Sequence, residues 1–178
     1  MEEKELIRLS AEGDKDAFSE LIKLYEKQIY NIAYRIAMNS QDAMDISQDS
    51  LIKIYNNIKY FEERSKFSTW IFRIVTNSAI DFIKKHRKYK FVNLEENIKD
   101  NLCVHEEFEK NENVRKVYNA LEKLDVNYRA IIILKDIYGF SYDEISKILI
   151  IPQGTVKSRL NRARKALKNR LLKEGYNE

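Results

Sequence analysis

The sequence predicts an all-α protein made of two helical modules, and three observations support this expectation. Apolar residues recur at spacings of three and four along most of the 178-residue chain, and the alternation typical of strands is scarce. Only four glycines and one proline are present, so few tight turns are available. Between residues 91 and 112 the periodicity lapses and acidic residues dominate, which indicates a flexible acidic linker between modules of residues 1–90 and 113–178.

The composition excludes several classes of protein. A content of 44% hydrophobic and 34% charged residues is ordinary for a helix-rich soluble chain. One cysteine, Cys103, and two histidines cannot form a disulfide framework or a Cys/His metal site, which fits a reducing cytoplasm. The N-terminal residues MEEKELIRL are acidic where a secretory signal is basic, and no apolar run approaches the ~20 residues that span a bilayer. We therefore expect a cytoplasmic protein that is neither exported nor anchored.

Three helices are expected in the first part of the first module. A short helix ends near Gly13, and a long amphipathic helix then runs from Asp14 to Ala37 with its apolar face in the core. Asn39 and Ser40 break this pattern. Ser40 can cap the third helix, which runs from about residue 41 to residue 60.

The third helix carries one apolar residue in the middle of its polar side. Ile52 points outward on the helical period, and its outward neighbours are polar: Asp45, Gln48, Asp49, Lys53 and Asn56. An apolar residue with a polar rim resembles the centre of a protein-docking patch. The alternative is an isolated exposed isoleucine without a role, which soluble proteins tolerate.

The same helix permits a second alternative, a magnesium-dependent enzyme. Asp42, Asp45 and Asp49 point in nearly one direction, as carboxylates that hold Mg²⁺ for diphosphate chemistry would. Such an enzyme also needs an enclosed cavity and a second acidic cluster. The chain is short and shows neither, so we do not favour this alternative.

An aromatic loop and a further helix complete the first module. Residues 60–67, YFEERSKF, lose the helical period, and Ser68 is expected to cap a helix that ends near residue 88. The side of this helix opposite its apolar stripe combines an aromatic ring, an amide and charged groups: Trp70, Arg73, Asn77, Asp81, Lys84 and Lys88. Proteins stack and hold unpaired bases on such surfaces. Alternatively, Phe67 and Trp70 cover a small core; we assign Phe67 to the core and leave both roles open for Trp70.

The second module is expected to end in a helix-turn-helix. Residues 128–138, YRAIIILKDIY, are nearly all apolar and predict a buried helix that Gly139 ends. Ser141 and Glu144 form a capping box for the next short helix, and Pro152 both stops it and opens the last one. The apolar stripe of that last helix contains Val156, Leu160, Ala163, Leu167 and Leu171.

The outer side of the last helix is strongly basic. No acidic residue occurs from Ser146 to Lys173, whereas nine lysines and arginines do. The phosphate backbone of duplex DNA is the natural partner of such a surface. A merely solvated helix is the alternative, but solvated surfaces normally mix both signs of charge.

Three motifs, in this order, resemble those of a bacterial sigma factor of the extracytoplasmic-function (ECF, group IV) branch of the sigma-70 family. The segment that binds the clamp of RNA polymerase is similar to residues 39–55, NSQDAMDISQDSLIKIY. The segment that melts and reads the minus-ten element is similar to residues 67–88, FSTWIFRIVTNSAIDFIKKHRK. The reader of the minus-thirty-five element is similar to residues 152–167, PQGTVKSRLNRARKAL.

This resemblance implies roles for individual residues. The implied contacts with core polymerase are Asp45, Gln48, Asp49, Ile52 and Lys53. The implied minus-ten contacts, which include capture of an extruded nontemplate base, are Tyr60, Phe61, Arg64, Lys66, Trp70, Arg73, Asn77, Lys84 and Lys88. The implied minus-thirty-five contacts are Thr155, Lys157, Ser158, Arg159, Asn161, Arg162, Arg164 and Lys165, of which Arg164 and Lys165 would lie nearer to phosphates.

The resemblance also implies the function. A protein of this kind carries no enzymatic reaction and needs no cofactor or metal; it binds core RNA polymerase and promoter DNA, and an anti-sigma factor often restrains it. The modules would correspond to sigma region 2 (residues 1–90) and sigma region 4 (residues 113–178). The alternative is a helix-turn-helix regulator that binds DNA without polymerase.

The sequence departs from the family pattern at two positions. Ile150 stands where the family often has a glycine, and because a β-branched residue disfavours positive φ, we expect a turn that is built differently. Met44 stands where a glutamate is usual. It lies at the edge of the implied docking face, so we expect little loss of function.

Overall fold

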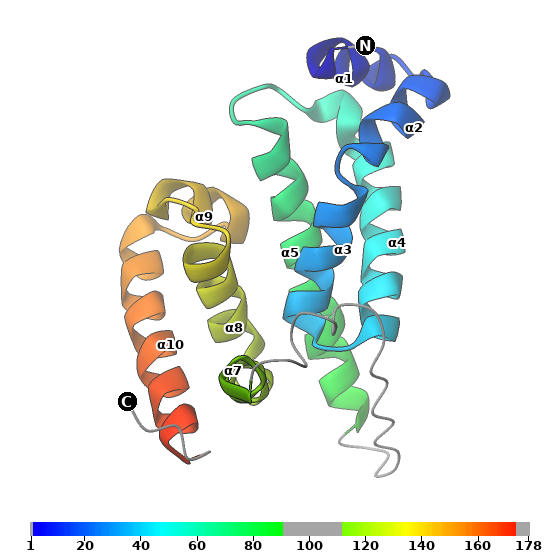
Figure 1. Ribbon diagram of the computed structural model, residues 1–178. Helices are drawn as coiled ribbons and strands as arrows, with labels where there is room; N and C mark the ends of the chain where they lie inside the picture. The colour runs from blue at the N-terminus through cyan, green and yellow to red at the C-terminus, as the bar shows by residue number, and fades with distance from the viewer. Residues whose placement is uncertain (1, 91–111, 174–178) are drawn as a thin grey trace.

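The structure, a computed structural model, describes residues 2–90 and 112–173 and contains only helices and loops in these ranges, so the prediction of an all-α fold is confirmed (Figure 1). Residues 91–111, which make up nearly all of the predicted linker, lie outside the described part. Glu112, the last residue assigned to the linker, already belongs to a helix.

Five α-helices and one 3-10 turn form the first module. They are α1 (Glu3–Ala11), α2 (Lys15–Lys23), α3 (Glu26–Ala37), α4 (Ser40–Asn57), the 3-10 turn η1 (Ile58–Tyr60) and α5 (Phe67–Lys90). Helices α3, α4 and α5 pack against one another, and α1 packs against α2 and η1 (Figure 1).

The long helix predicted from Asp14 to Ala37 is wrong, because the chain turns at Leu24 and Tyr25 between α2 and α3. The predicted helix start at Asp14 is confirmed, and the Asp14 side chain caps α2 by accepting a hydrogen bond from the Ala17 backbone N–H at 3.0 Å. The Tyr25 ring is buried edge-on against Phe67 at 5.6 Å, and its hydroxyl donates to Glu3 of α1. These contacts with distant residues hold the turn, which the apolar period does not reveal.

Helix α4 begins one residue earlier than expected. The cap is Asn39 rather than Ser40: the Asn39 side chain accepts a hydrogen bond from the Asp42 backbone N–H at 2.8 Å. Likewise α5 begins at Phe67, so Ser68 lies inside its first turn instead of capping it.

The second module consists of four α-helices, one of them extended by a π-helical turn, within residues 112–173. They are α7 (Glu112–Glu122), α8 (Val126–Ile132), the π-helical turn η2 (Ile133–Ile137), α9 (Tyr142–Leu149) and α10 (Gln153–Lys173). The predicted buried helix is confirmed as α8 and η2, with Gly139 in the left-handed conformation (φ 71°) after it. The π-helical turn was not predicted.

The helix-turn-helix is present, with the capping box of Ser141 and Glu144 at its start. The prediction that Ile150 changes the turn is wrong: Ile150 adopts the left-handed conformation that glycine usually supplies, with φ 54° and ψ 49°. The Ile150 and Ile151 backbone N–H groups both donate to the Ser146 carbonyl and thereby end α9.

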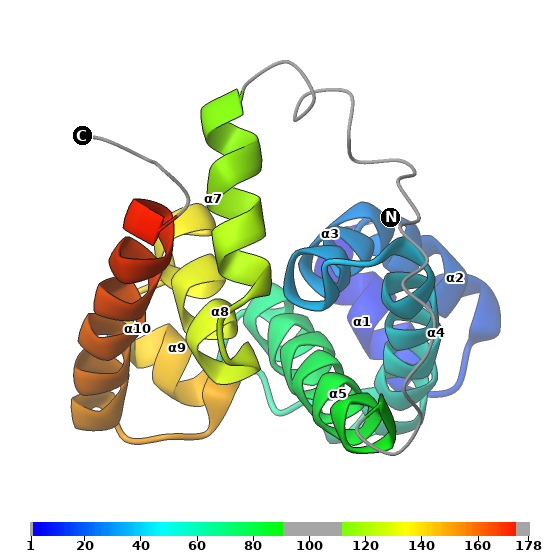
Figure 2. The same ribbon diagram turned by 90° about the horizontal axis from the view of Figure 1, so that it is seen from below.

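The two modules pack side by side through α5, which contacts α8 and α9 (Figures 1 and 2). The Phe72 ring of α5 lies edge-on to Tyr138 at 5.1 Å and to Phe140 at 5.0 Å. Arg35 of α3 donates to the Tyr118 hydroxyl of α7. Burial raises the pKa values of Tyr118 and Tyr138, although the nearby Arg35 opposes this shift.

A buried arginine joins both modules. Arg129 of α8 is 2% exposed. Its guanidinium donates to the carbonyls of Leu121 and Glu122 at the end of α7, to that of Leu124 in the loop after it, and to that of Ile36 of α3 at 2.5 Å. The planar fork of five donors explains why arginine suits this position.

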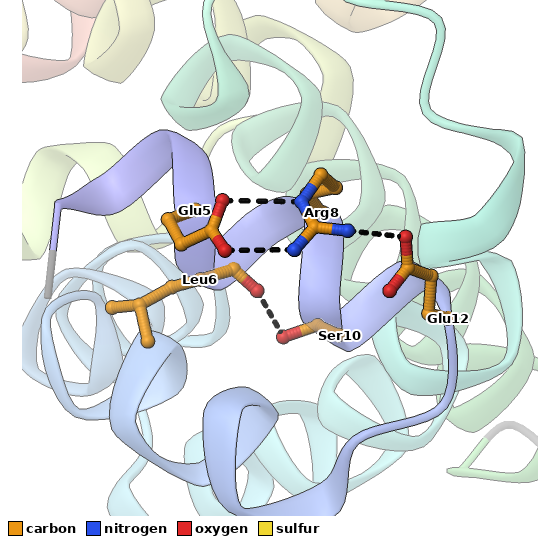
Figure 3. Close-up of polar contacts among 5 residues, drawn as sticks. All are labelled: Glu5, Leu6, Arg8, Ser10 and Glu12. Atoms are coloured by element: carbon orange, nitrogen blue, oxygen red, sulfur yellow. Dashed lines mark hydrogen bonds and ion pairs between the residues drawn. The ribbon is translucent and has the colours of Figure 1, made fainter.

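We predict that Arg129→Met lowers the free energy of unfolding by about 2–4 kcal/mol, because several buried carbonyls lose their donor. Urea denaturation followed by circular dichroism measures this change. Arg8→Met is the matched control: Arg8 donates to Glu5 and Glu12 on the exposed side of α1, next to the buried Ser10–Leu6 hydrogen bond (Figure 3), and we expect no marked loss. Equal losses in both variants would contradict the role of Arg129.

Candidate docking and nucleic-acid interfaces

The outer side of α4 is open to solvent over the whole predicted docking patch. Every predicted docking residue is exposed: Asp45, Gln48, Asp49, Ile52 and Lys53. The Ile52 side chain is 60% exposed, whereas Ile46 and Ile54 on the inner side are buried. The helical period explains this difference, because it places Ile52 on the outer side of α4 and Ile46 and Ile54 on the inner side.

Two further apolar residues extend this patch. Met44 is 47% exposed and Tyr55 is 40% exposed. Together with Ile52 they lie at helical spacings of eight and three, so they form one stripe along α4. Tyr55 was not predicted as part of this patch; its ring also packs edge-on against Phe18 of α2, with the ring centres 4.9 Å apart. We name Met44, Asp45, Gln48, Asp49, Ile52, Lys53 and Tyr55 the docking face.

The arrangement that a magnesium enzyme needs is not found in residues 2–90 and 112–173. No three histidine, cysteine, aspartate or glutamate side chains lie close enough there to hold a metal ion. Asp42 sits in the first turn of α4.

Trp70, for which the sequence left two roles open, belongs to an aromatic cluster of the core. Trp70 is only 7% exposed, and its ring stacks on Phe67 at 5.5 Å and lies 5.5 Å from Phe61. Phe67 is 4% exposed, which confirms its assignment to the core. Of the two roles left open for Trp70, the structure therefore supports the core role, because the Phe61 ring of the loop after η1 packs against it.

An open cavity of about 400 Å³ lies between α4, η1 and α5. Four residues predicted to hold a base contribute to its wall: Tyr60, Trp70, Arg73 and Asn77. Tyr60 is 66% exposed, and Lys59 Nζ lies over its ring, 5.0 Å from the ring centre. The rim combines a ring, a cation and an amide, which suits a planar base with polar edges. We name this the base-holding cavity.

Two polar side chains of the cavity wall, those of Lys53 and Asn77, already form hydrogen bonds within the protein. Lys53 Nζ donates to Ser78 Oγ at 2.9 Å and thereby links the docking face to α5. Asn77 Nδ2 donates to the Arg73 carbonyl at 2.7 Å and to the Ile148 carbonyl of α9 at 2.8 Å.

The other residues predicted to contact the minus-ten element differ in their exposure to solvent. Phe61 is half-buried, and Lys66 and Lys84 are exposed. Arg64 is exposed and forms an ion pair with Glu62 at 2.7 Å. The side chain of Lys88 lies outside the described part.

Helix α10 presents the predicted basic face. Val156, Leu160 and Ala163 are buried against the module. The exposed predicted residues are Lys157, Ser158, Asn161, Arg162, Arg164 and Lys165, and the half-buried ones are Thr155 and Arg159. The exposed side of α10 is therefore lined by hydrogen-bond donors and cations, as expected for a recognition helix.

Two contacts that the sequence did not reveal hold α10 in place. Arg164 donates to the Asp136 carboxylate of η2, with Nε 3.2 Å from Oδ2, so Arg164 is tied to its own module. Gln153 at the start of α10 donates to Asp143 of α9 at 3.0 Å. Lys147 forms an ion pair with Asp143 at 2.6 Å and holds the pKa of that carboxyl below its usual value.

Two family models match separate stretches of the chain. The one described as Sigma-70 region 2 matches residues 21–89, which include the docking face and the base-holding cavity. The one described as Sigma-70, region 4 matches residues 115–167, which include the helix-turn-helix.

Curated relatives match nearly the whole chain. The ECF RNA polymerase sigma factor SigW of Bacillus subtilis is 35% identical, and the match covers 94% of this chain and 96% of the relative. The ECF RNA polymerase sigma-E factor of Salmonella typhimurium is 30% identical, with 93% and 92% covered.

Solved structures share the fold. The sigma factor RpoE of Bartonella quintana, in complex with the anti-sigma factor NepR, has a TM-score of 0.68 at 28% identity, with 90% of this chain and 98% of that chain covered. CnrH, in complex with the cytosolic domain of CnrY, also has a TM-score of 0.68, at 24% identity. The matches to the family models and to the curated relatives show that the chain belongs to the ECF branch of the sigma-70 family of RNA polymerase sigma factors.

Proposed function

We propose that the chain binds core RNA polymerase and directs it to promoters, where it recognises the minus-thirty-five and minus-ten elements and helps to melt the DNA. The observation that carries this proposal is the exposed apolar stripe on α4 in the same chain as the basic face of α10. A regulator that binds DNA alone needs only the second surface. The chain is a transcription initiation factor, and we assign it no reaction of its own and no cofactor.

The docking face is the proposed polymerase contact. Exposed apolar side chains with acidic neighbours fit the anatomy of a protein interface, an apolar centre with a polar rim. Ile52 is the most exposed apolar residue of this face and is assigned its centre.

The base-holding cavity is the proposed site for an extruded base of the nontemplate strand. Stacking contributes about 1–3 kcal/mol per base, and unstacking costs a few kcal/mol, so a few such contacts can hold a bubble open. Tyr60 is assigned the stacking role because its ring is exposed, whereas Trp70 is buried in the aromatic cluster. Arg73 supplies a cation in the same cavity wall.

The exposed and half-buried polar residues of α10 are the proposed readers of the minus-thirty-five element. Lys157, Arg159 and Arg162 can donate to guanine in the major groove, and Lys165 can contact phosphates. Arg164 can reach a phosphate only if it leaves Asp136 or shares its guanidinium with that carboxylate.

We further propose that an anti-sigma factor restrains the chain in the cytoplasm. The complex of RpoE with the anti-sigma factor NepR is the basis for this part of the proposal. No helix within residues 2–90 and 112–173 is both long and apolar enough to cross a bilayer.

Ile52→Glu should weaken association with core polymerase about 30-fold or more, because it places a charge at the centre of an apolar contact beside two aspartates. Comigration with core polymerase on a glycerol gradient measures the loss. Leu24→Glu is the matched control, since Leu24 is 56% exposed at the turn between α2 and α3. Retained association of the Ile52 variant, or an equal loss in the control, would remove the docking role.

Arg162→Ala should relax the preference for one base pair of the minus-thirty-five element by about 1–3 kcal/mol. Binding to a set of duplexes that differ at single positions measures this preference. Arg170→Ala, a change at an exposed cation in the last turn of α10, should leave the preference unchanged. A sequence-independent loss in the Arg162 variant would instead indicate a phosphate contact.

A further inference from the structure

An arginine of the proposed recognition helix is bound to a carboxylate of its own module. Arg164 Nε donates to Asp136 Oδ2 at 3.2 Å, and a terminal nitrogen of the same guanidinium donates to Asp136 Oδ1. Arginine binds a phosphate group through the same pair of parallel hydrogen bonds. A phosphate of DNA and the Asp136 carboxylate therefore compete for the same donors.

The position of Arg164 suits a phosphate contact. It follows Lys157 by seven residues, so the two side chains lie on the same side of α10, and Lys157 is exposed. Within the ion pair the Arg164 side chain is 52% exposed and that of Asp136 is 37% exposed. An ion pair this open to solvent contributes little to stability. Its main effect is therefore on the charge that α10 presents.

The π-helical turn η2 carries the carboxylate that pairs with α10. The Tyr138 backbone N–H donates to the Ile133 carbonyl, five residues before it, at 3.1 Å. The additional residue in such a turn changes the direction in which Asp136 points relative to α8, and turns of this kind are frequent at functional sites. Ile133 and Leu134 of the same turn are buried, whereas Asp136 is exposed, and α8 packs against α10 (Figure 1).

We propose that Asp136 limits the affinity of the second module for DNA by occupying Arg164 in place of a DNA phosphate. The inference rests on the proposed contact between α10 and duplex DNA. No acidic residue occurs from Ser146 to Lys173, so Asp136 brings to α10 a negative charge that this helix itself lacks. Each contact with a phosphate releases counterions and makes the affinity fall more steeply with salt. Asp136 thus removes one such contact, whatever the DNA sequence.

The experiment compares the full-length chain with its Asp136→Asn variant on a short fluorescein-labelled duplex of mixed sequence. Fluorescence anisotropy gives the dissociation constant over a series of potassium chloride concentrations. We expect the variant to bind about three- to tenfold tighter at ~0.1 M salt, with a slope of log K against log[salt] steeper by about 0.9, the value for one phosphate contact. Combining Asp136→Asn with Arg164→Gln should abolish both changes, because the released guanidinium is their source.

Glu112→Gln is the matched control for the loss of a negative charge. Glu112 forms an ion pair with Lys116 of its own helix, α7, at 3.0 Å, and neither residue is a proposed DNA contact. This control should have the affinity and the salt dependence of the parent chain.

Three outcomes would each overturn the proposal: unchanged affinity and salt dependence in the Asp136 variant, an equal gain in the control, or a gain that persists in the double variant. Weaker binding of the Asp136 variant would also overturn it, because the ion pair would then position α10 rather than compete with DNA. Comigration with core polymerase is measured in parallel. Its absence in every chain would contradict the proposed function, whereas the anisotropy measurement needs no polymerase and decides the role of Asp136 by itself.

Discussion

Helix α5 is packed on two sides, and the arrangement of the whole chain depends on this double contact. Helices α3 and α4 cover one part of it, and α8 and α9 cover another. Phe72 meets the aromatic residues of the second module, whereas Ser78 takes the hydrogen bond from Lys53 of α4. A helix that is buried on more than one side loses the clear amphipathic pattern of a surface helix. For this reason a single apolar stripe underestimated how much of α5 is buried.

Much of the fold was predictable because it depends on contacts within one or two helical turns. The capping box at Ser141, the burial of α8 and the outward position of Ile52 all follow from local spacing. The turn between α2 and α3 does not: neither glycine nor proline marks it, and Tyr25 is held there by partners in α1 and α5. Such long-range contacts leave no periodic signal in the sequence.

The candidate site likewise combines features that local spacing predicts with features that depend on contacts between distant residues. Helical period places Trp70 beside Arg73 and Asn77, but the Phe61 ring covers Trp70 from a loop whose path the sequence does not specify. The hydrogen bond from Asn77 to Ile148 joins residues 71 positions apart. At Ile150 the local preference of the residue disagrees with the structure, because the left-handed conformation costs about 1–2 kcal/mol for a residue with a Cβ. Two backbone hydrogen bonds to Ser146 and the burial of the flanking α9 residues offset that cost.

The two proposed surfaces of the first module therefore differ in access. Ile52, at the centre of the docking face on α4, is 60% exposed, whereas the wall of the base-holding cavity includes Ile150 and an amide that donates to the Ile148 carbonyl. Lys53 touches both surfaces, since it is exposed on α4 and donates to Ser78 of α5. Under the proposed function, polymerase binds the docking face, and the hydrogen bond from Lys53 to Ser78 connects that face to the wall of the base-holding cavity.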